Sequence, residues 1–343
     1  MRFEIIGKIE KAKSDKIIFF DEKTSEGGWI NRTLKFNVKS GNNTFLMEVR
    51  GGRSKDDSKA LIYSTIKKED GKYENVQFLH KDKEKYIPKL AEFKKSVIVF
   101  DKDTRLDFAT SYDFALALKD IVESEQYADA NFKVVGEVEY SKYNGKEYKK
   151  MIPTRIYVTD QEISQGGSVE LYFGEGSFDD GSYEDNKIAY INGYVVQYDG
   201  KAKKKLAFNQ QVKYDFNAVH GENADKAYNV LKRMFNVSGE ELHKIGFKIN
   251  HVNGTTSVPF NIEMATDEEK ELLELGFIDL KTLQEQYGNG KGSFVSEVVV
   301  TGLAKGYTSG AIESGQTLAD FQEEVATDDE VFENLFNDED LFN

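Results

Sequence analysis

The sequence FEIIGKIE at residues 3–10 sets the expected architecture, because the same pattern returns as FKVVGEVE at residues 132–139. Each copy consists of Phe, a charged residue, two β-branched residues, Gly, a charged residue, a β-branched residue and Glu. Such alternation is typical of a strand, and a Gly inside it predicts a bulge or a sharp bend. A repeat of about 130 residues is far longer than a solenoid period. We therefore expect two similar domains, at residues 1–128 and 129–312, followed by a tail at residues 313–343.

Hairpin patterns fill the first domain. Turn-forming residues at 40–43 and 69–71 separate runs rich in β-branched and aromatic residues, which is the signal of β-hairpins. Strands are expected at residues 3–13, 29–39, 45–50, 60–67, 73–79 and 97–100. Apolar residues at helical spacing predict a helix at 112–127. Short strands joined by hairpins and closed by a helix indicate a small barrel.

The second domain repeats this pattern with additions. A turn at residues 143–146 follows the opening strand. Further strands are expected at residues 148–158, 169–173, 188–198, 205–216 and 294–303. A Gly- and Asp-rich loop is expected at residues 174–186, with inserted helices at residues 224–235, 267–275 and 280–287. The expected fold class is mainly β with added helices (α+β): two barrels, the second with helical insertions, and a disordered acidic tail.

The negative charge is concentrated at the C-terminus. The net charge is −14, but residues 306–343 hold eleven acids and no basic residue, so residues 1–305 carry a net charge of only −3. A near-neutral body leaves room for local basic grooves that attract phosphate. The absence of Cys excludes disulfides and zinc–thiolate sites. No apolar run approaches the roughly 18 residues of a membrane span, and the N-terminus lacks a signal-peptide core, so we expect a soluble, intracellular protein.

Basic and aromatic residues interleave on the strands of both domains. Aromatic rings can stack on unpaired bases while Lys and Arg follow the phosphates, a combination that binds single strands with little sequence preference. The candidate DNA-binding residues are Trp29, Arg32, Lys35, Phe36, Arg50, Arg53, Tyr63, Tyr143, Lys146, Tyr148, Lys149, Lys150, Arg155, Tyr157, Tyr190, Tyr194, Tyr198, Lys203 and Lys204.

The acidic tail keeps apolar residues among its acids, which indicates a partner that binds them. The candidate partner-binding residues are Phe332, Phe336, Asp338, Glu339, Asp340, Leu341 and Phe342. Such a tail can also occupy a basic groove of its own chain as a polyanion mimic that DNA displaces.

A Gly-bent first strand, basic and aromatic hairpins and the ending Asp338-Glu-Asp-Leu-Phe-Asn343 resemble single-stranded DNA-binding proteins of the OB-fold type, in the style of bacteriophage proteins with two OB domains in one chain. The resemblance implies tandem Greek-key barrels and non-enzymatic binding and protection of single-stranded DNA in replication, repair and recombination. It also implies a tail that recruits a polymerase, helicase or primase, and a cytoplasmic location, in the bacterial host if phage-encoded. Bacterial relatives usually end in Pro-Phe after a long low-complexity linker, and this chain has neither.

Two other functions stay open. The first is a virion or assembly component, or a carbohydrate-binding barrel, without nucleic-acid binding. The second is a metal-dependent nuclease that uses the loop Asp179–Asp185, although this loop lacks EF-hand spacing. The four His residues are dispersed, with His243 and His251 flanking one expected strand. Gly288–Ser293 lacks the spacing of a phosphate-binding loop. We therefore expect no enzyme activity, no metal and no cofactor.

Overall fold

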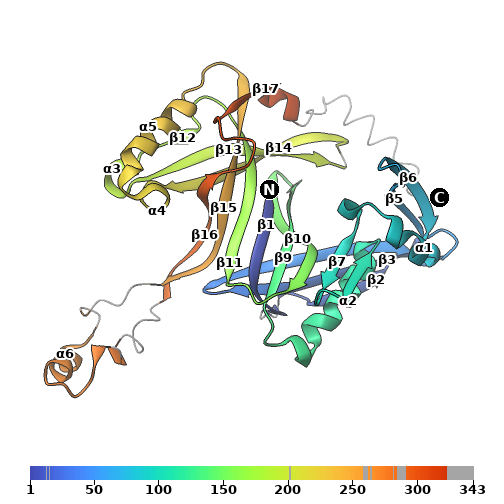
Figure 1. Ribbon diagram of the computed structural model, residues 1–343, viewed down its shortest axis with the longest axis horizontal. Coiled ribbons are helices and arrows are strands. Elements are labelled where there is room, and N and C mark those ends of the chain that lie inside the picture. The colour runs from blue at the N-terminus through green and yellow to red at the C-terminus, as the bar shows by residue number, and fades with distance from the viewer. Residues whose placement is uncertain are drawn as a thin grey trace.

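The fold is seen in a computed structural model of the chain (Figure 1). The structure describes residues 1–12, 14, 16–200, 202–257, 262, 265–280, 282–283 and 291–322, with the backbone alone at 256, 257 and 291–293. Within these residues the chain is mostly β: one mixed sheet contains fifteen strands, and a separate sheet contains two. The expectation of a mainly β protein with added helices is confirmed in this coarse form. The division into two OB-like barrels stays a prediction.

The elements follow one another along the chain in a fixed order. The strands are β1 (Arg2–Lys11), β2 (Phe20–Thr24), β3 (Trp29–Ser40), β4 (Asn43–Ser54), β5 (Leu61–Lys67), β6 (Tyr73–Leu79), β7 (Ser96–Val99), β8 (Arg105–Phe108), β9 (Phe132–Tyr143), β10 (Lys146–Val158), β11 (Ser164–Phe173), β12 (Phe178–Asp179), β13 (Ile188–Asp199), β14 (Lys204–Asp215), β15 (Glu241–Ser257), β16 (Lys291–Leu303) and β17 (Ile312–Thr317). The α-helices are α1 (Lys83–Tyr86), α2 (Ser111–Glu123), α3 (Tyr183–Asn186), α4 (Phe216–His220), α5 (Ala224–Met234) and α6 (Asp267–Glu274).

The two copies of the repeated stretch pair with each other. Strands β1 and β9 are antiparallel neighbours, with Phe3 opposite Gly136 and Gly7 opposite Phe132. At the centre, Ile5 lies opposite Val134, its own counterpart in the repeat. The Phe of each copy thus faces the Gly of the other, and the pairing has a local two-fold symmetry.

Both repeat glycines are required by close backbone contacts. A Cβ on Gly7 would lie 2.2 Å from the carbonyl oxygen of Lys39, and a Cβ on Gly136 would lie 2.1 Å from that of Ile152. At Gly7 the strand β1 also changes partner, from β9 to β3. No side chain larger than hydrogen fits such approaches without backbone movement.

Helices cover only parts of the sheet (Figure 1). Helix α2 begins at an N-cap, where the side chain of Thr110 accepts a hydrogen bond from the backbone of Asp113. Its buried residues, at helical spacing, face β3 and β4. Gly51 permits the approach, since a Cβ there would meet the backbone nitrogen of Tyr112 at 2.3 Å. Helices α3, α4 and α5 gather beside β12 and β13.

The structure adds strands that the sequence patterns did not predict. These are β2, β8, β12 and β17. The strand expected between His243 and His251 is longer than that, because it is part of the 17-residue strand β15, which pairs with β11, β16 and β17. Residues 312–317 form β17 and Phe321 is 2% exposed against Tyr172, so the packed chain extends past residue 313, where we expected the tail to begin. The expected helix at residues 280–287 falls largely outside the described residues.

Candidate nucleic-acid interface

The hairpin β3–β4 sorts its candidate residues onto two faces. In the register of the two strands, Trp29, Lys35 and Arg50 lie on one face with Leu46 and Glu48, because successive side chains of a strand point to opposite sides. Trp29 is 47% exposed and Arg50 is exposed. These three residues are placed to meet a ligand on this face.

The other face of this hairpin packs against the core and α2, and it overturns one prediction. Phe36 is fully buried, so the prediction that it stacks on a base is wrong. Arg32 lies 3.7 Å from the centre of the Tyr112 ring and pairs with Glu22. Arg53, on the same side, pairs with Asp57. Both arginines are committed to internal contacts.

The hairpin β9–β10 presents a second set of candidate residues. Asn144 and Gly145 both have positive φ, as the two-residue turn between paired Tyr143 and Lys146 requires. Register places the exposed residues Tyr143, Lys146 and Tyr148 on one face with Lys150.

The two hairpin faces are continuous. Met151 of β10 pairs with Met47 of β4; Met47 is fully buried, and Met151 is half-buried against the same core. Their neighbours Lys150 and Glu48 therefore share the outer side, where an ion pair of 2.6 Å joins them. We call the surface made by Trp29, Lys35, Arg50, Tyr143, Lys146, Tyr148 and Lys150 the basic–aromatic face. Its residues follow the first repeat copy in the hairpin β3–β4 and the second copy in the hairpin β9–β10.

The opposite face of β9–β10 braces the hairpin against β14. The Lys149 ammonium donates to Gln210 at 2.9 Å and lies over the Tyr140 ring, and Glu147 accepts two hydrogen bonds from Asn209. Burial of its ammonium end lowers the pKa of Lys149, although the residue as a whole is exposed. Lys149 thus anchors the hairpin as well as lining the pocket described next.

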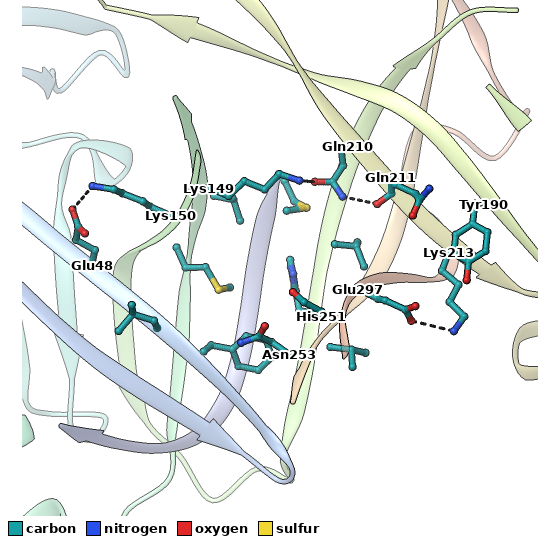
Figure 2. Close-up of a pocket in the computed structure, with 18 residues that line it drawn as sticks. Glu48, Lys149, Lys150, Tyr190, Gln210, Gln211, Lys213, His251, Asn253 and Glu297 are labelled. Atoms are coloured by element: carbon teal, nitrogen blue, oxygen red, sulfur yellow. Dashed lines mark hydrogen bonds and ion pairs between the residues drawn. The ribbon is translucent and has the colours of Figure 1, made fainter. Parts of the chain in front are cut away.

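A pocket of about 440 Å³ lies where the basic–aromatic face meets the second half of the chain (Figure 2). Strands β4, β9 and β10 line one side, and β13, β14, β15 and β16 line the other. We call it the junction pocket. Its labelled polar residues in Figure 2 are Glu48, Lys149, Lys150, Tyr190, Gln210, Gln211, Lys213, His251, Asn253 and Glu297.

An ion pair closes each end of the junction pocket, as Figure 2 shows. At one end Glu48 binds Lys150 at 2.6 Å and Lys35 at 3.7 Å. At the other end Glu297 binds Lys213 at 3.0 Å.

His251 lies in the wall of this pocket and is 6% exposed. Its Nε2 has no hydrogen-bond partner among the described residues, and a Cβ on Gly167 would approach that nitrogen to 2.9 Å. Burial lowers the pKa of His251 to about 4. The side chain is therefore neutral in the folded protein at neutral pH.

We expect this histidine to destabilise the fold in acid. The pKa of His251 is about 4 in the folded chain, below its ordinary value of 6.5. Between these pH values His251 is protonated in the unfolded chain and neutral in the folded chain, so the stability of the fold decreases as the pH falls. The loss reaches roughly 2 kcal/mol near pH 5. Denaturant unfolding at neutral and acidic pH should show this excess loss in the wild type and not in His251→Asn. An equal acid sensitivity of both proteins would contradict it.

The hairpin β13–β14 distributes its candidate residues less uniformly. Tyr190 lines the junction pocket opposite Lys213. Tyr194 is half-buried in a small cluster with Phe321, while Tyr198 is 60% exposed. At the tip of the hairpin, Lys203 is exposed and Lys204 is half-buried. The structure brings only Tyr190 of this group into the pocket.

The remaining candidates lie outside the basic–aromatic face. Tyr63 is 74% exposed on the separate β5–β6 sheet. Arg155 donates to the backbone of Glu92, and Tyr157 is half-buried beside β7. The partner-binding candidates Phe332, Phe336, Asp338, Glu339, Asp340, Leu341 and Phe342 fall outside the described residues.

The far wall of the junction pocket holds residues that the sequence patterns did not indicate. Lys213, Gln210, Gln211, His251 and Asn253 were not among the candidates. Lys213 could have been predicted from the sequence, because pairing residues 188–198 with residues 205–216 places it opposite Tyr190. His251 and Asn253 lie on β15, at the end of the strand expected between His243 and His251 and beyond it.

The acidic loop proposed for a nuclease is held by α5. Asp180 accepts a hydrogen bond from Tyr228 and pairs with Lys232, both at 2.6 Å. These bonds lower the pKa of Asp180. Tyr183 stacks on Tyr228 with ring centres 3.6 Å apart. Within the described residues no three His, Asp or Glu side chains gather in a way that could hold a metal ion.

Comparisons with known proteins give little guidance. No family model and no curated protein matches the chain. Among solved structures, a deletion mutant of the single-stranded DNA binding protein from Thermus aquaticus is similar over 74% of this chain and 86% of its own, with 10% identity and a TM-score of 0.30. That value is too low to carry an argument. In the part of the chain described, no helix has the length and apolarity to cross a membrane.

Proposed function

We propose that the protein binds single-stranded DNA without acting on it chemically, and that the strand lies on the basic–aromatic face and enters the junction pocket. One observation carries this proposal: aromatic residues and lysines from the hairpins β3–β4 and β9–β10 share one continuous face. Exposed rings can stack on unpaired bases, and the interleaved cations can follow the backbone. A duplex offers no unpaired base faces, so this arrangement favours single strands.

The internal repeat supports a tandem architecture for this task. Each copy is a Gly-containing strand whose Gly lies close to the backbone of a later strand, Gly7 to β3 and Gly136 to β10. We propose that the two copies begin two OB-like units that lie back to back through β1 and β9. The strand would then cross from one unit to the other at the Glu48–Lys150 pair.

The acidic residues beyond Gln322 complete the proposal. Their charge and spaced Phe residues suit a dual role, competing with DNA for the basic–aromatic face and binding replication proteins such as a polymerase, helicase or primase. Their partners would meet the protein in the cytoplasm, within a bacterial host if the chain is phage-encoded. Replication, repair and recombination all expose the single strands that such a protein protects.

The proposal is tested by titrating fluorescent oligo(dT) with the full chain and with a chain ending at Gln322. This end point keeps β17 and the buried Phe321. We expect both to bind, the truncated chain more tightly, with affinity falling steeply as salt rises. If neither binds at low salt, the proposal fails, and a protein- or carbohydrate-binding barrel takes its place. Equal affinity of the two chains would remove only the competing role of the tail.

Replacing Glu48 should strengthen binding. Glu48→Gln frees Lys35 and Lys150 from their shared carboxylate, so both can neutralise phosphate. We expect affinity for oligo(dT) to rise about fivefold at low salt, with a steeper salt dependence because more counterions are released. Glu22→Gln, which frees the enclosed Arg32 instead, serves as the matched control and should change little. Unchanged or weaker binding by Glu48→Gln would place the strand elsewhere.

A further inference from the structure

Two exposed apolar surfaces lie at opposite ends of the long axis of the molecule (Figure 1). One is carried by residues 265–280, which contain α6 and project beyond the paired ends of β15 and β16. The other is carried by residues 61–95, which contain the two-stranded β5–β6 sheet. We call them the acidic arm and the basic head. Neither surface belongs to the basic–aromatic face or the junction pocket.

The acidic arm exposes large apolar side chains. Phe277 is 76% exposed, Leu275 is 63% exposed and Leu280 is 48% exposed. All three lie between residues 275 and 280, directly after α6. Large exposed apolar residues gathered in a projecting segment are typical of an interaction site. Around them residues 265–280 contain six acids and one lysine.

The basic head has the complementary properties. Tyr63 is 74% exposed, and Tyr73 and Phe93 form an exposed edge-to-face pair with ring centres 5.3 Å apart. Residues 61–95 contain nine lysines against six acids. Lys67 lies opposite Tyr73 on the same face of the sheet, and Lys94 has the Phe93 ring as its neighbour.

A hollow in the basic head is open to a side chain that projects from a partner. Its volume is about 400 Å³, and its lining combines Tyr63 and Val76 with the polar residues Ser64, Thr65, Asn75, Gln77 and Lys94. The arm carries its most exposed ring, Phe277, beside acids that suit Lys94. Apolar contact would supply affinity, and charge would orient the pair.

We infer that the acidic arm of one copy docks on the basic head of a second copy of this chain. The two surfaces lie at opposite ends of one molecule, so the acidic arm cannot reach the basic head of the same chain. A contact between two different surfaces is heterologous, so it adds one copy after another in an open row unless its rotation closes the row into a ring. Such a row follows the geometry of a strand that several copies bind side by side.

The contact is expected to be weak in dilute solution. An eight-residue helix and its following turn cover less than the roughly 1,600 Å² of a standard stable interface. Two copies bound next to each other on one strand would meet at a much higher effective concentration. The association should therefore be detectable at high protein concentration alone and become strong on long single strands.

The absence of cysteine in the natural chain permits a direct test. Glu274→Cys places a lone thiol on the arm, and Gln77→Cys places one on the head; both positions are exposed. A short bismaleimide is added to each full-length variant and to their mixture, first at high concentration without DNA and then with long oligo(dT). We expect about tenfold more cross-linked dimer in the mixture than in either variant alone, and a further rise on DNA.

Control variants make each outcome decisive. Adding Phe277→Ser to the arm variant should abolish the cross-link, whereas Leu106→Ser, at an exposed leucine of β8, should not. Lys67→Glu with Lys94→Glu on the head should weaken it, and Glu268→Lys with Glu271→Lys on the arm should restore it. A cross-link in the arm variant alone would show an arm-to-arm contact and overturn the inference. The lack of any cross-link, with and without DNA, would also overturn it and assign the arm to a different protein.

Discussion

Replacing Tyr143 and Tyr148 together with Ala should weaken oligo(dT) binding at least about thirtyfold, since one base–aromatic stack contributes about 1–3 kcal/mol. Tyr143 is 66% exposed and Tyr148 is 45% exposed. They lie diagonally across the β9–β10 hairpin, where Tyr143 pairs with Lys146 and Tyr148 pairs with Ser141. Neither ring is in the core, so the loss should appear in binding and not in stability.

Two matched variants separate stacking from other causes. Tyr143→Phe with Tyr148→Phe keeps both rings and should bind within about threefold of the wild type. Tyr73→Ala removes an equally exposed ring from the basic head and should leave the affinity for a short oligo(dT) unchanged. Fluorescence titration at fixed salt measures all of these affinities. Wild-type affinity in the double Ala variant would move the strand off the basic–aromatic face.

Local patterns in the sequence predict the hairpins well. The alternation of apolar and polar residues along each strand also predicts which face of the strand is buried. The two-residue alternation in β3 places Leu34, Phe36 and Val38 on one side and Trp29 and Lys35 on the other. An apolar row on one side of a strand marks the buried face. This alternation alone places Phe36 on the buried face, so it excludes Phe36 as a DNA contact. It leaves Trp29 and Lys35 on the outer face as candidate DNA contacts.

Other parts of the fold depend on contacts that no local pattern records. Strand β15 carries a histidine, His251, at a buried position where an apolar residue would have completed the alternation. Strand β17 has an acidic, Gly-containing sequence, and its place is set by pairing with β15 and by the burial of Phe321. The junction pocket joins strands from residue 45 to residue 298, so only the assembled sheet shows it.

The repeated Gly was predicted to bend its strand, and the structure gives the position a stricter role. The carbonyl of Ile152 and the ring of Phe3 both occupy the space where a Cβ on Gly136 would lie, at 2.1 Å and 2.6 Å. Opposite Gly136, strand β10 has an irregular register between Pro153 and Arg155. Gly136 thus lies opposite Phe3 of β1 on one side and opposite the irregular part of β10 on the other.

Gly136→Ala should therefore destabilise the fold by at least about 3 kcal/mol, since overpacking against a fixed backbone cannot be relieved by turning a side chain. Gly7→Ala should act similarly, because its Cβ would meet the carbonyl of Lys39 at 2.2 Å. Gly166→Ala is the matched control: it lies in the neighbouring strand β11, and its Cβ would find nothing nearer than 3.7 Å. Denaturant unfolding should show a change of less than about 1 kcal/mol for this control. Similar stability of all three variants would mean that β1 and β9 do not pair as described. A large loss of stability in both repeat-glycine variants, but not in Gly166→Ala, would show that both copies of the repeat need a Gly at this position. That shared requirement explains why the same short pattern occurs twice in the chain.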